Sequence, residues 1–136
     1  MSSQIACDLV WIPRVQRALD RYGHRWVQRL LSCEEYAYCC AENVPKRRQI
    51  ERIAARLAVK EAIAKVLGVG VCGLGYQDGI RWQDVSFNHQ REITLLAKAR
   101  AFADRKGFSR WQASVAHDGD YAMATVLAER DHQAAL

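Results

Sequence analysis

The middle of the sequence contains one long stretch, Lys46 to Leu67, that has the composition and the boundaries of a single helix. Ala, Leu, Lys and Glu dominate its second half, and neither Gly nor Pro interrupts it, so its helix propensity is high. Pro45 precedes the stretch, and Gly68 and Gly70 follow it, as is typical of residues that flank a helix. The rest of the chain must therefore fold around one long helix.

Charged residues gather in one part of this predicted helix, the segment R-L-A-V-K-E-A-I-A-K from Arg56 to Lys65. Glu61 and Lys65 are one turn apart and share a face, while Arg56 and Lys60 lie earlier on the helix. One carboxylate among three cations suits a metal–pyrophosphate substrate, because the carboxylate can bind the metal and the cations can bind phosphate oxygens. The alternative is a solvated helix face with ion pairs four residues apart.

The other segments predict an α+β fold in which an antiparallel sheet packs against the long helix. The strands are expected at Ile5–Trp11, Ile80–Phe87, Ile93–Leu96, Trp111–Ala116 and Tyr121–Ala128, the last two joined as a hairpin by the turn His117–Asp120. Further helices are expected at Pro13–Leu31 with a break at Gly23, at Cys33 to about Ala41 after a capping box of Ser32 and Glu35, and at Ala97–Lys106. The five glycines between Gly68 and Gly79 indicate a loop.

Composition limits the class of protein without choosing a function. Half of the residues are hydrophobic and 26% are charged, which excludes a disordered chain and favours one globular domain over residues 1–136. No apolar run approaches the roughly 20 residues of a membrane span, and the N-terminus lacks a signal-peptide pattern, so we expect a cytoplasmic protein. The net charge of +5 favours an acidic partner: nucleic acid, an anionic membrane, a phosphorylated ligand or an acidic protein.

The five cysteines are odd in number and include no C-x-x-C pair. This argues against a disulfide framework and against a structural zinc site. We therefore expect all five to be reduced thiols.

Two further residues stand out against apolar surroundings. Asp8 interrupts the run I-A-C-D-L-V-W-I, where a carboxylate is costly unless it is paired or bound to a metal. The alternative for Asp8 is a residue that caps a backbone turn at the end of a strand. His117 ends a later apolar run, and its alternative is an ordinary histidine in the turn of the hairpin.

In this order, the segments resemble the holo-acyl carrier protein synthase branch of the 4′-phosphopantetheinyl transferases. The resemblance extends from about Ile5 to Glu129 and rests on the early Asp8, the central K-E-A-x-x-K, and a late S-x-x-H followed by Y-A-x-A. L-S-C-E-E and W-Q-D-V lie between these motifs. The resemblance implies that 4′-phosphopantetheine is transferred from coenzyme A to a serine of an apo-acyl carrier protein, with Mg²⁺, and that 3′,5′-ADP is released. The attacking hydroxyl then belongs to the partner, and the metal and the cations stabilise the charge that builds on the phosphate oxygens.

The resemblance also implies roles for single residues. Asp8 and Glu61 take the positions of the two metal ligands, and Lys65 takes that of the lysine that contacts the pyrophosphate. These three are the expected catalytic residues. The expected coenzyme-binding residues are Arg56, Lys60, Lys65, Ser114 and His117, of which Arg56 and His117 match positions used for the 3′-phosphate.

Arginines recur at intervals of three or four residues along the predicted first helix and form one stripe. A solvated face is the alternative, but five arginines without a lysine favour multidentate binding of carboxylates or phosphates. The resemblance implies that this helix docks the acidic helix of the carrier protein, and that active sites lie between the subunits of a homotrimer. The stripe comprises Arg14, Arg17, Arg21, Arg25 and Arg29.

The chain departs from the family pattern at several positions. Gln4 and Ala6 replace paired glycines, Leu57 replaces a Phe, Ala116 replaces the second serine of S-x-S-H, and Asn88–Glu92 replaces a G-x-P segment that lines the adenine site in relatives. Because the metal and pyrophosphate residues are retained, we expect an active enzyme, specialised for a particular carrier rather than the general carrier of fatty acid biosynthesis. The alternatives are an impaired homologue that only binds the carrier or coenzyme A, and a basic nucleic-acid-binding module, which would leave Asp8 and Glu61 without a role.

Overall fold

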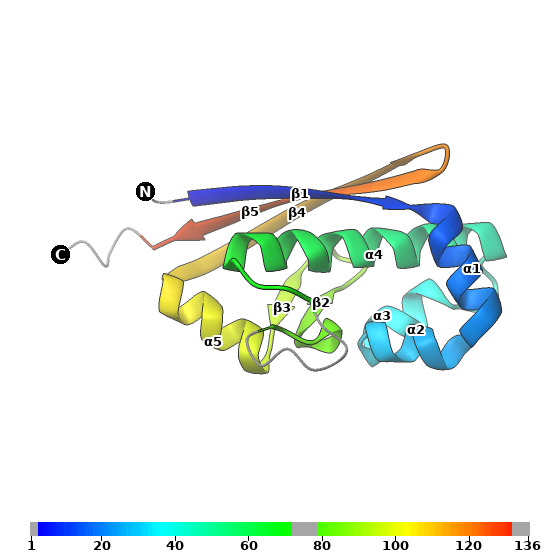
Figure 1. Cartoon of the computed structure of the whole chain (residues 1–136), viewed down its shortest axis with the longest axis horizontal. Coiled ribbons are helices and arrows are strands. Elements are labelled where there is room, and N and C mark those ends of the chain that lie inside the picture. Colours follow the sequence, from blue (N-terminus) through cyan, green and yellow to red (C-terminus); the bar gives the residue numbers. More distant parts are fainter. Residues whose placement is uncertain (1–2, 72–78, 132–136) are drawn as a thin grey trace.

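The computed structural model describes residues 3–71 and 79–131 and has a three-stranded antiparallel sheet lying along one long helix, α4 (Lys46–Leu67) (Figure 1). The sheet order is β1 (Ser3–Trp11), β5 (Tyr121–Arg130) and β4 (Phe108–Asp118). The shorter helices and a two-stranded sheet lie on the other side of α4 (Figure 1). This arrangement confirms the predicted α+β fold, and α4 has the bounds that the sequence predicts.

The two faces of the three-stranded sheet differ in exposure. Val10, Ala124 and Val126 point toward α4 and are fully buried. Because side chains alternate along a strand, the neighbouring residues lie on the opposite face, which is exposed in the single chain. On this outer face Ile5 is 70% exposed and Leu9 is 59% exposed, so the sheet presents apolar side chains on both sides.

Helix α4 is buried on most of its circumference because the sheet covers one side and the smaller elements cover the other. Apolar residues occur on all sides of this helix, which is typical of a helix in the centre of a protein. Fourteen of its residues are buried, and two of them, Arg56 and Lys60, are cations. The helix ends at Gly68, whose φ of 73° places it in the left-handed conformation that commonly ends a helix.

The predicted first helix is two helices, α1 (Ile12–Tyr22) and α2 (His24–Leu30), separated at Gly23 as expected. Gly23 has φ 72° and ψ −169°, a conformation that is essentially restricted to glycine. The next helix, α3 (Cys33–Cys39), begins with the predicted capping box of Ser32 and Glu35, in which both reciprocal hydrogen bonds are present.

Replacing Gly23 by Ala should lower the free energy of unfolding by about 1–3 kcal/mol, because a Cβ cannot adopt these dihedral angles without strain. A Cβ there would meet no atom within 4 Å, so the cost comes from the backbone alone. Urea denaturation measures it, and Gly68→Ala is the matched control, because its ordinary left-handed conformation costs a non-glycine residue less. Equal losses from the two variants would contradict this explanation.

The predicted strand Ile80–Phe87 is wrong in its first half. Only β2 (Val85–Phe87) is a strand and pairs with β3 (Ile93–Leu95), whereas Trp82–Asp84 forms the 3₁₀ turn η1. The Asp84 side chain accepts a hydrogen bond of 3.0 Å from the backbone N–H of Arg81, which closes the turn and prevents an extended chain.

The remaining helices and strands are found where they were predicted, but β4 (Phe108–Asp118) is longer than the predicted strand Trp111–Ala116 and includes His117, which was predicted in the turn. Helix α5 (Ala97–Lys106) ends at Gly107, and β4 and β5 form the predicted hairpin. Most of the predicted Gly68–Gly79 loop, residues 72–78, lies outside the described residues. Within the described ranges, each helix is too short or too polar to cross a membrane.

Candidate active site

The Asp8 carboxylate lies between the sheet and α4, on the face of β1 that also carries the buried Val10. The Lys65 ammonium donates a hydrogen bond of 2.8 Å to Asp8 Oδ1 and one of 2.9 Å to the backbone oxygen of Cys7. The hydrogen bond to Asp8 raises the pKa of Lys65. The structure thus brings together two predicted site residues from distant parts of the chain. The ammonium of Lys65 contacts the carboxylate of Asp8, which the sequence predicts to bind a metal.

Glu61 lies one turn before Lys65 on α4 and completes this group. Burial raises the pKa of Glu61, and the negative charge of Asp8 raises it further, while Arg14 and Lys65 act in the opposite direction. The two carboxylates therefore share one electrostatic environment. Among the described residues no group of three or more His, Cys, Asp or Glu side chains could hold a metal ion. A divalent cation bound at Asp8 and Glu61 would thus take its other ligands from substrate or water, as Mg²⁺ often does.

The raised pKa of Glu61 has a consequence for stability. The pKa of this carboxyl group is higher in the folded state than in the unfolded state, so its protonated form favours folding. This contribution is lost as the pH rises from 4.5, the ordinary pKa of a glutamate, through the raised pKa of the folded state. In metal-free protein, Glu61→Gln should therefore have the higher Tm at neutral pH, by a few degrees, and the difference should shrink in acid. Thermal melts from pH 4 to pH 8 measure it, with the exposed Glu42→Gln as control. A lower Tm for Glu61→Gln at pH 7 would contradict the raised pKa.

A cavity of about 280 Å³ lies beside Glu61, between α1, α2, α4 and η1. Its wall is mostly apolar, with the carboxylate of Glu61 and the guanidinium of Arg14 as its charged members. Such a cavity can take an apolar group next to an anionic reaction centre. The lining residues are Arg14, Val15, Ala18, Trp26, Leu30, Leu57, Glu61 and Trp82.

Arg56 is a buried cation whose hydrogen bonds are weak. It is 5% exposed, and it donates to the backbone oxygens of Arg52 and Asn88 at 3.4 Å each. Its Nε atom is buried and has no hydrogen-bond partner in residues 3–71 and 79–131. The guanidinium lies over the rings of Tyr38 at 4.8 Å and Phe87 at 5.2 Å. Since a buried cation without good partners is costly, Arg56 is suited to receive an anionic oxygen.

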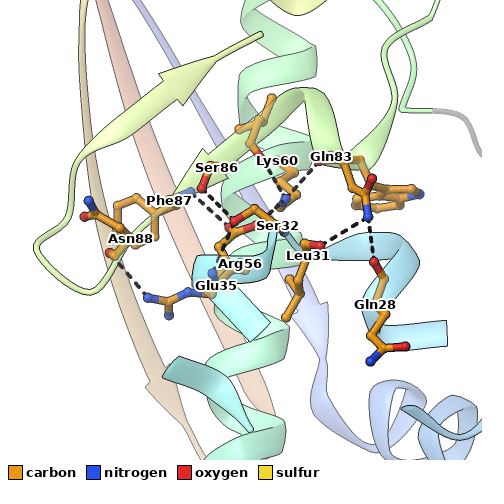
Figure 2. A network of polar contacts seen from close by, with 12 residues as sticks. Gln28, Leu31, Ser32, Glu35, Arg56, Lys60, Gln83, Ser86, Phe87 and Asn88 are labelled. Atoms are coloured by element: carbon orange, nitrogen blue, oxygen red, sulfur yellow. Dashed lines mark hydrogen bonds and ion pairs between the residues drawn. The ribbon is translucent and has the colours of Figure 1, made fainter. Parts of the chain in front are cut away.

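The prediction that Lys60 contacts the coenzyme does not fit the structure. Lys60 is fully buried, and its ammonium donates to Glu35 Oε1 at 2.8 Å, to the backbone oxygen of Trp82 at 2.8 Å and to that of Val85 (Figure 2). These three acceptors use all three N–H groups of a lysine. Sequence reasoning identified Glu35 only as a capping residue and missed its ion pair with Lys60, because no local pattern links positions 25 residues apart.

His117 and Ser114 lie on opposite faces of β4. His117 pairs with the buried Ala122 on the face toward α4, and its Nδ1 is 2.9 Å from Glu51 Oε2. His117 is thus within the strand and not in the turn, which begins after Asp118. Ser114 is three residues earlier, so it points to the outer face of the sheet. Within one chain, Ser114 therefore does not face α4 and the residues predicted to act with it.

The arginines of the predicted stripe are divided between two helices, because α1 ends and α2 begins at Gly23. Arg17 stacks on Trp11 at 4.9 Å and Arg21 on Tyr22 at 5.3 Å, so the apolar surface near α1 is lined with cations. The α2 arginines, together with Tyr22 and Trp26, line a second cavity of about 320 Å³. The α1 group is Arg14, Arg17 and Arg21, and the α2 group is Arg25 and Arg29.

Comparison with known proteins finds relatives over most of the chain. Residues 4–126 match the family model of the 4′-phosphopantetheinyl transferase superfamily. The chain belongs to this family. It is 39% identical over 125 residues to the holo-[acyl-carrier-protein] synthase of Gloeobacter violaceus, covering 90% of this chain and 89% of that protein. It is 36% identical over 131 residues to the holo-[acyl-carrier-protein] synthase of Syntrophotalea carbinolica, covering 93% of this chain and 95% of that protein.

Solved structures of the family have the same fold. The Helicobacter pylori holo-[acyl-carrier-protein] synthase in complex with coenzyme A gives a TM-score of 0.71 at 26% identity and covers 93% of this chain and 100% of that chain. A Plasmodium yoelii acyl carrier protein synthase with ADP bound gives a TM-score of 0.75 at 19% identity and covers 97% of this chain and 100% of that chain. At this identity the likeness supports the fold alone. The family predicted from the sequence and the enzyme class, a phosphopantetheinyl transferase, are therefore confirmed.

Proposed function

We propose that this phosphopantetheinyl transferase moves 4′-phosphopantetheine from coenzyme A to a serine of an apo-acyl carrier protein, with Mg²⁺, and releases 3′,5′-ADP. The observation that carries the proposal is the group of Asp8, Glu61 and Lys65, in which two carboxylates and a cation interact and Glu61 also lines an apolar cavity. The relatives named above are holo-[acyl-carrier-protein] synthases, which supports the same substrates here.

The residues present fit a Mg²⁺ ion. Asp8 and Glu61 would hold it, since each is partly or largely buried and the Asp8 carboxylate already binds one cation, the ammonium of Lys65. When bound, the metal would neutralise charge on the pyrophosphate. The serine oxygen of the carrier forms a bond to the β-phosphorus while the bond from that phosphorus to the oxygen of the leaving 3′,5′-ADP breaks, and the proton of the serine hydroxyl is released to water. Lys65 binds the phosphate oxygens, where its fixed positive charge stabilises the charge that develops.

Arg56 is proposed to bind the 3′-phosphate of the coenzyme. Its buried and weakly bonded guanidinium would gain charge-assisted hydrogen bonds from the anion, which it lacks within the described chain. His117 and Ser114 are proposed to contribute to this end of the coenzyme across a subunit boundary. The position of Ser114 on the outer face of the sheet supports that assignment, because a neighbouring subunit packed there would meet it.

A homotrimer is part of the proposal. The outer face of the sheet carries large apolar side chains that are exposed in the single chain, and an exposed apolar patch commonly marks a protein interface. Sedimentation equilibrium tests it, with a mass three times that of the chain as the expected result. A monomer at micromolar concentration would contradict shared active sites. The patch includes Ile5, Leu9, Trp11, Tyr121 and Met123.

The carrier protein is proposed to dock on α1 and α2, with its acidic helix against the two arginine groups. The apolar cavity beside Glu61 lies between these helices and α4, so a carrier seated there would present its serine near the reaction centre. The departures of this chain from the family pattern support a carrier specialised for one pathway. Similar rates on several unrelated carriers would refute that preference. We further propose that residues 1–136 form one domain that acts in the cytoplasm.

Replacing Arg25 by Glu should lower kcat/KM for the carrier by about tenfold, mostly through a higher KM, because it reverses one charge in the docking surface. The loss should shrink as the salt concentration rises, since ions screen exposed charges. Steady-state rates at 50 and 500 mM NaCl provide the measurement. Arg105→Glu on α5 makes the same charge change elsewhere and should have little effect. Equal losses for both variants would place docking outside α2.

The test of the proposed function is the intact mass of a panel of apo-carrier proteins after incubation with the enzyme, coenzyme A and magnesium. The expected result is a gain of one phosphopantetheine that is abolished by EDTA and by Asp8→Ala. If no carrier gains mass while coenzyme A still binds, the chain is an impaired homologue, for which Ala116 in place of a serine is the first candidate cause.

A further inference from the structure

Glu35 and Lys60 form an ion pair that is completely buried and that the proposed chemistry does not use. Both side chains are 0% exposed, and Lys60 Nζ lies 2.8 Å from Glu35 Oε1. The two residues come from α3 and α4. Because desolvation offsets most of the attraction within a buried pair, such a pair is a weak source of stability and calls for another explanation.

The pair binds one segment of backbone, residues 82–87, at three points (Figure 2). Lys60 donates to the backbone oxygens of Trp82 and Val85, and Glu35 Oε2 accepts the N–H of Phe87 at 2.9 Å. Glu35 Oε1 also accepts the N–H of Ser32 at 2.8 Å, which fixes the start of α3. The pair therefore joins this segment to α3 and to α4 at once.

Side-chain contacts outside the pair hold the same segment. Ser32 Oγ and Ser86 Oγ are 2.9 Å apart, and the Gln83 amide donates to the backbone oxygens of Gln28 at 2.6 Å and Leu31 at 3.3 Å (Figure 2). The segment from η1 to β2 thus takes its position from polar contacts to three helices. The ion pair is the buried centre of these contacts.

Both ends of the clamped segment reach regions that the proposed function uses. At one end, Trp82 lines the cavity that Glu61 also lines. At the other end, the Phe87 ring lies 5.2 Å from the Arg56 guanidinium, and the backbone oxygen of Asn88 accepts a hydrogen bond from Arg56. On α4 itself, Lys60 comes one turn after Arg56 and directly before Glu61.

We propose that Glu35 and Lys60 are positioning residues for coenzyme binding, an inference that rests on the proposed function. By clamping residues 82–87 onto α4, they hold Phe87, and with it the adjoining Asn88, against Arg56, and they hold Trp82 at the cavity. Neither residue touches the reacting atoms. Asp8, Glu61 and Lys65 are carried by β1 and α4, so loss of the clamp should weaken coenzyme binding more than it slows turnover.

The test uses the double variant Glu35→Gln/Lys60→Met, which removes both charges together and leaves no lone charge in the core. We expect KM for coenzyme A to rise at least about tenfold, as for other residues that orient binding groups, with kcat changed by less than about threefold. Hydrogen exchange of the Phe87 amide should become faster, while amides in the centre of β5 keep their protection. Phe108→Leu, a buried substitution at the start of β4, controls for lost stability alone and should leave KM unchanged.

A folded double variant with the KM and the Phe87 exchange rate of the wild type would overturn the proposal and leave the pair a purely structural element. If the double variant does not fold, Glu35→Asp answers the same question, because it keeps the charge but withdraws the carboxylate by one methylene. Wild-type enzyme that neither binds nor uses coenzyme A would refute the proposed function, and the inference with it. Wild-type activity with unaltered kinetics in the variants refutes the inference alone.

Discussion

Replacing Glu61 by Gln should reduce the rate of phosphopantetheine transfer by at least about 100-fold, because it removes one of the two carboxylates proposed to hold the metal at the site of charge development. The amide of Gln keeps the shape of the side chain, so the cavity beside it should be preserved. The proposed metal-binding role also predicts that the variant binds Mn²⁺, used as a probe, more weakly than the wild type does. The relaxation rate of water protons in solutions of the free enzyme with Mn²⁺ measures this binding.

The Glu61→Gln protein should remain folded and should still bind its carrier, because the docking surface lies on α1 and α2. Carrier binding by fluorescence anisotropy separates a lost reaction from a lost complex. Glu42→Gln makes the same chemical change at an exposed position and should be fully active. An active Glu61→Gln enzyme would remove this residue from the metal site and leave Asp8 as its sole protein carboxylate in the proposal.

Replacing Lys60 alone by Met should lower the free energy of unfolding by about 3–5 kcal/mol, because it leaves the carboxylate of Glu35 buried without its partner. Stabilities of single domains are only about 5–15 kcal/mol, so this one change could unfold much of the protein at 37 °C. Urea denaturation of wild type and variant at one protein concentration measures the difference.

The same substitution at an exposed lysine gives the control for this stability prediction. The Lys46 side chain is 66% exposed and its ammonium is 3.5 Å from Asp20, so Lys46→Met should cost less than about 1 kcal/mol. The double variant Glu35→Gln/Lys60→Met should recover part of the loss, since no lone charge remains. A single Lys60→Met variant as stable as the wild type would mean that water reaches the Glu35 carboxylate.

Local signals in the sequence predicted several structural features correctly. The bounds of α4 follow from uninterrupted helix formers between Pro45 and Gly68, and the start of α3 follows from the reciprocal bonds of Ser32 and Glu35. These features depend on residues a few positions apart, so the sequence contains them directly. The strand predicted for Ile80–Phe87 was wrong in part, because Asp84 bonds the backbone of Arg81 and turns the chain.

Among the predicted site residues, the sequence identified Asp8, Glu61 and Lys65 as candidates, and the structure brings Asp8 and Lys65 into direct contact. The sequence also predicted Lys60, the neighbour of Glu61, as a site residue. Lys60 is fully buried, however, whereas Glu61 borders a cavity. The reason is that successive residues on a helix point about 100° apart, and only packed neighbours decide which direction is covered.

By itself, the sequence determined the family, the central helix, its caps and the carboxylates and cations available for phosphate chemistry. The tertiary structure alone decided which of those charges meet: Lys65 reaches Asp8 across the α4–β1 contact, and Lys60 turns inward to Glu35. It also separated Ser114 from His117 onto opposite faces of β4. Such pairings depend on contacts between residues distant along the chain, which propensity and spacing do not encode.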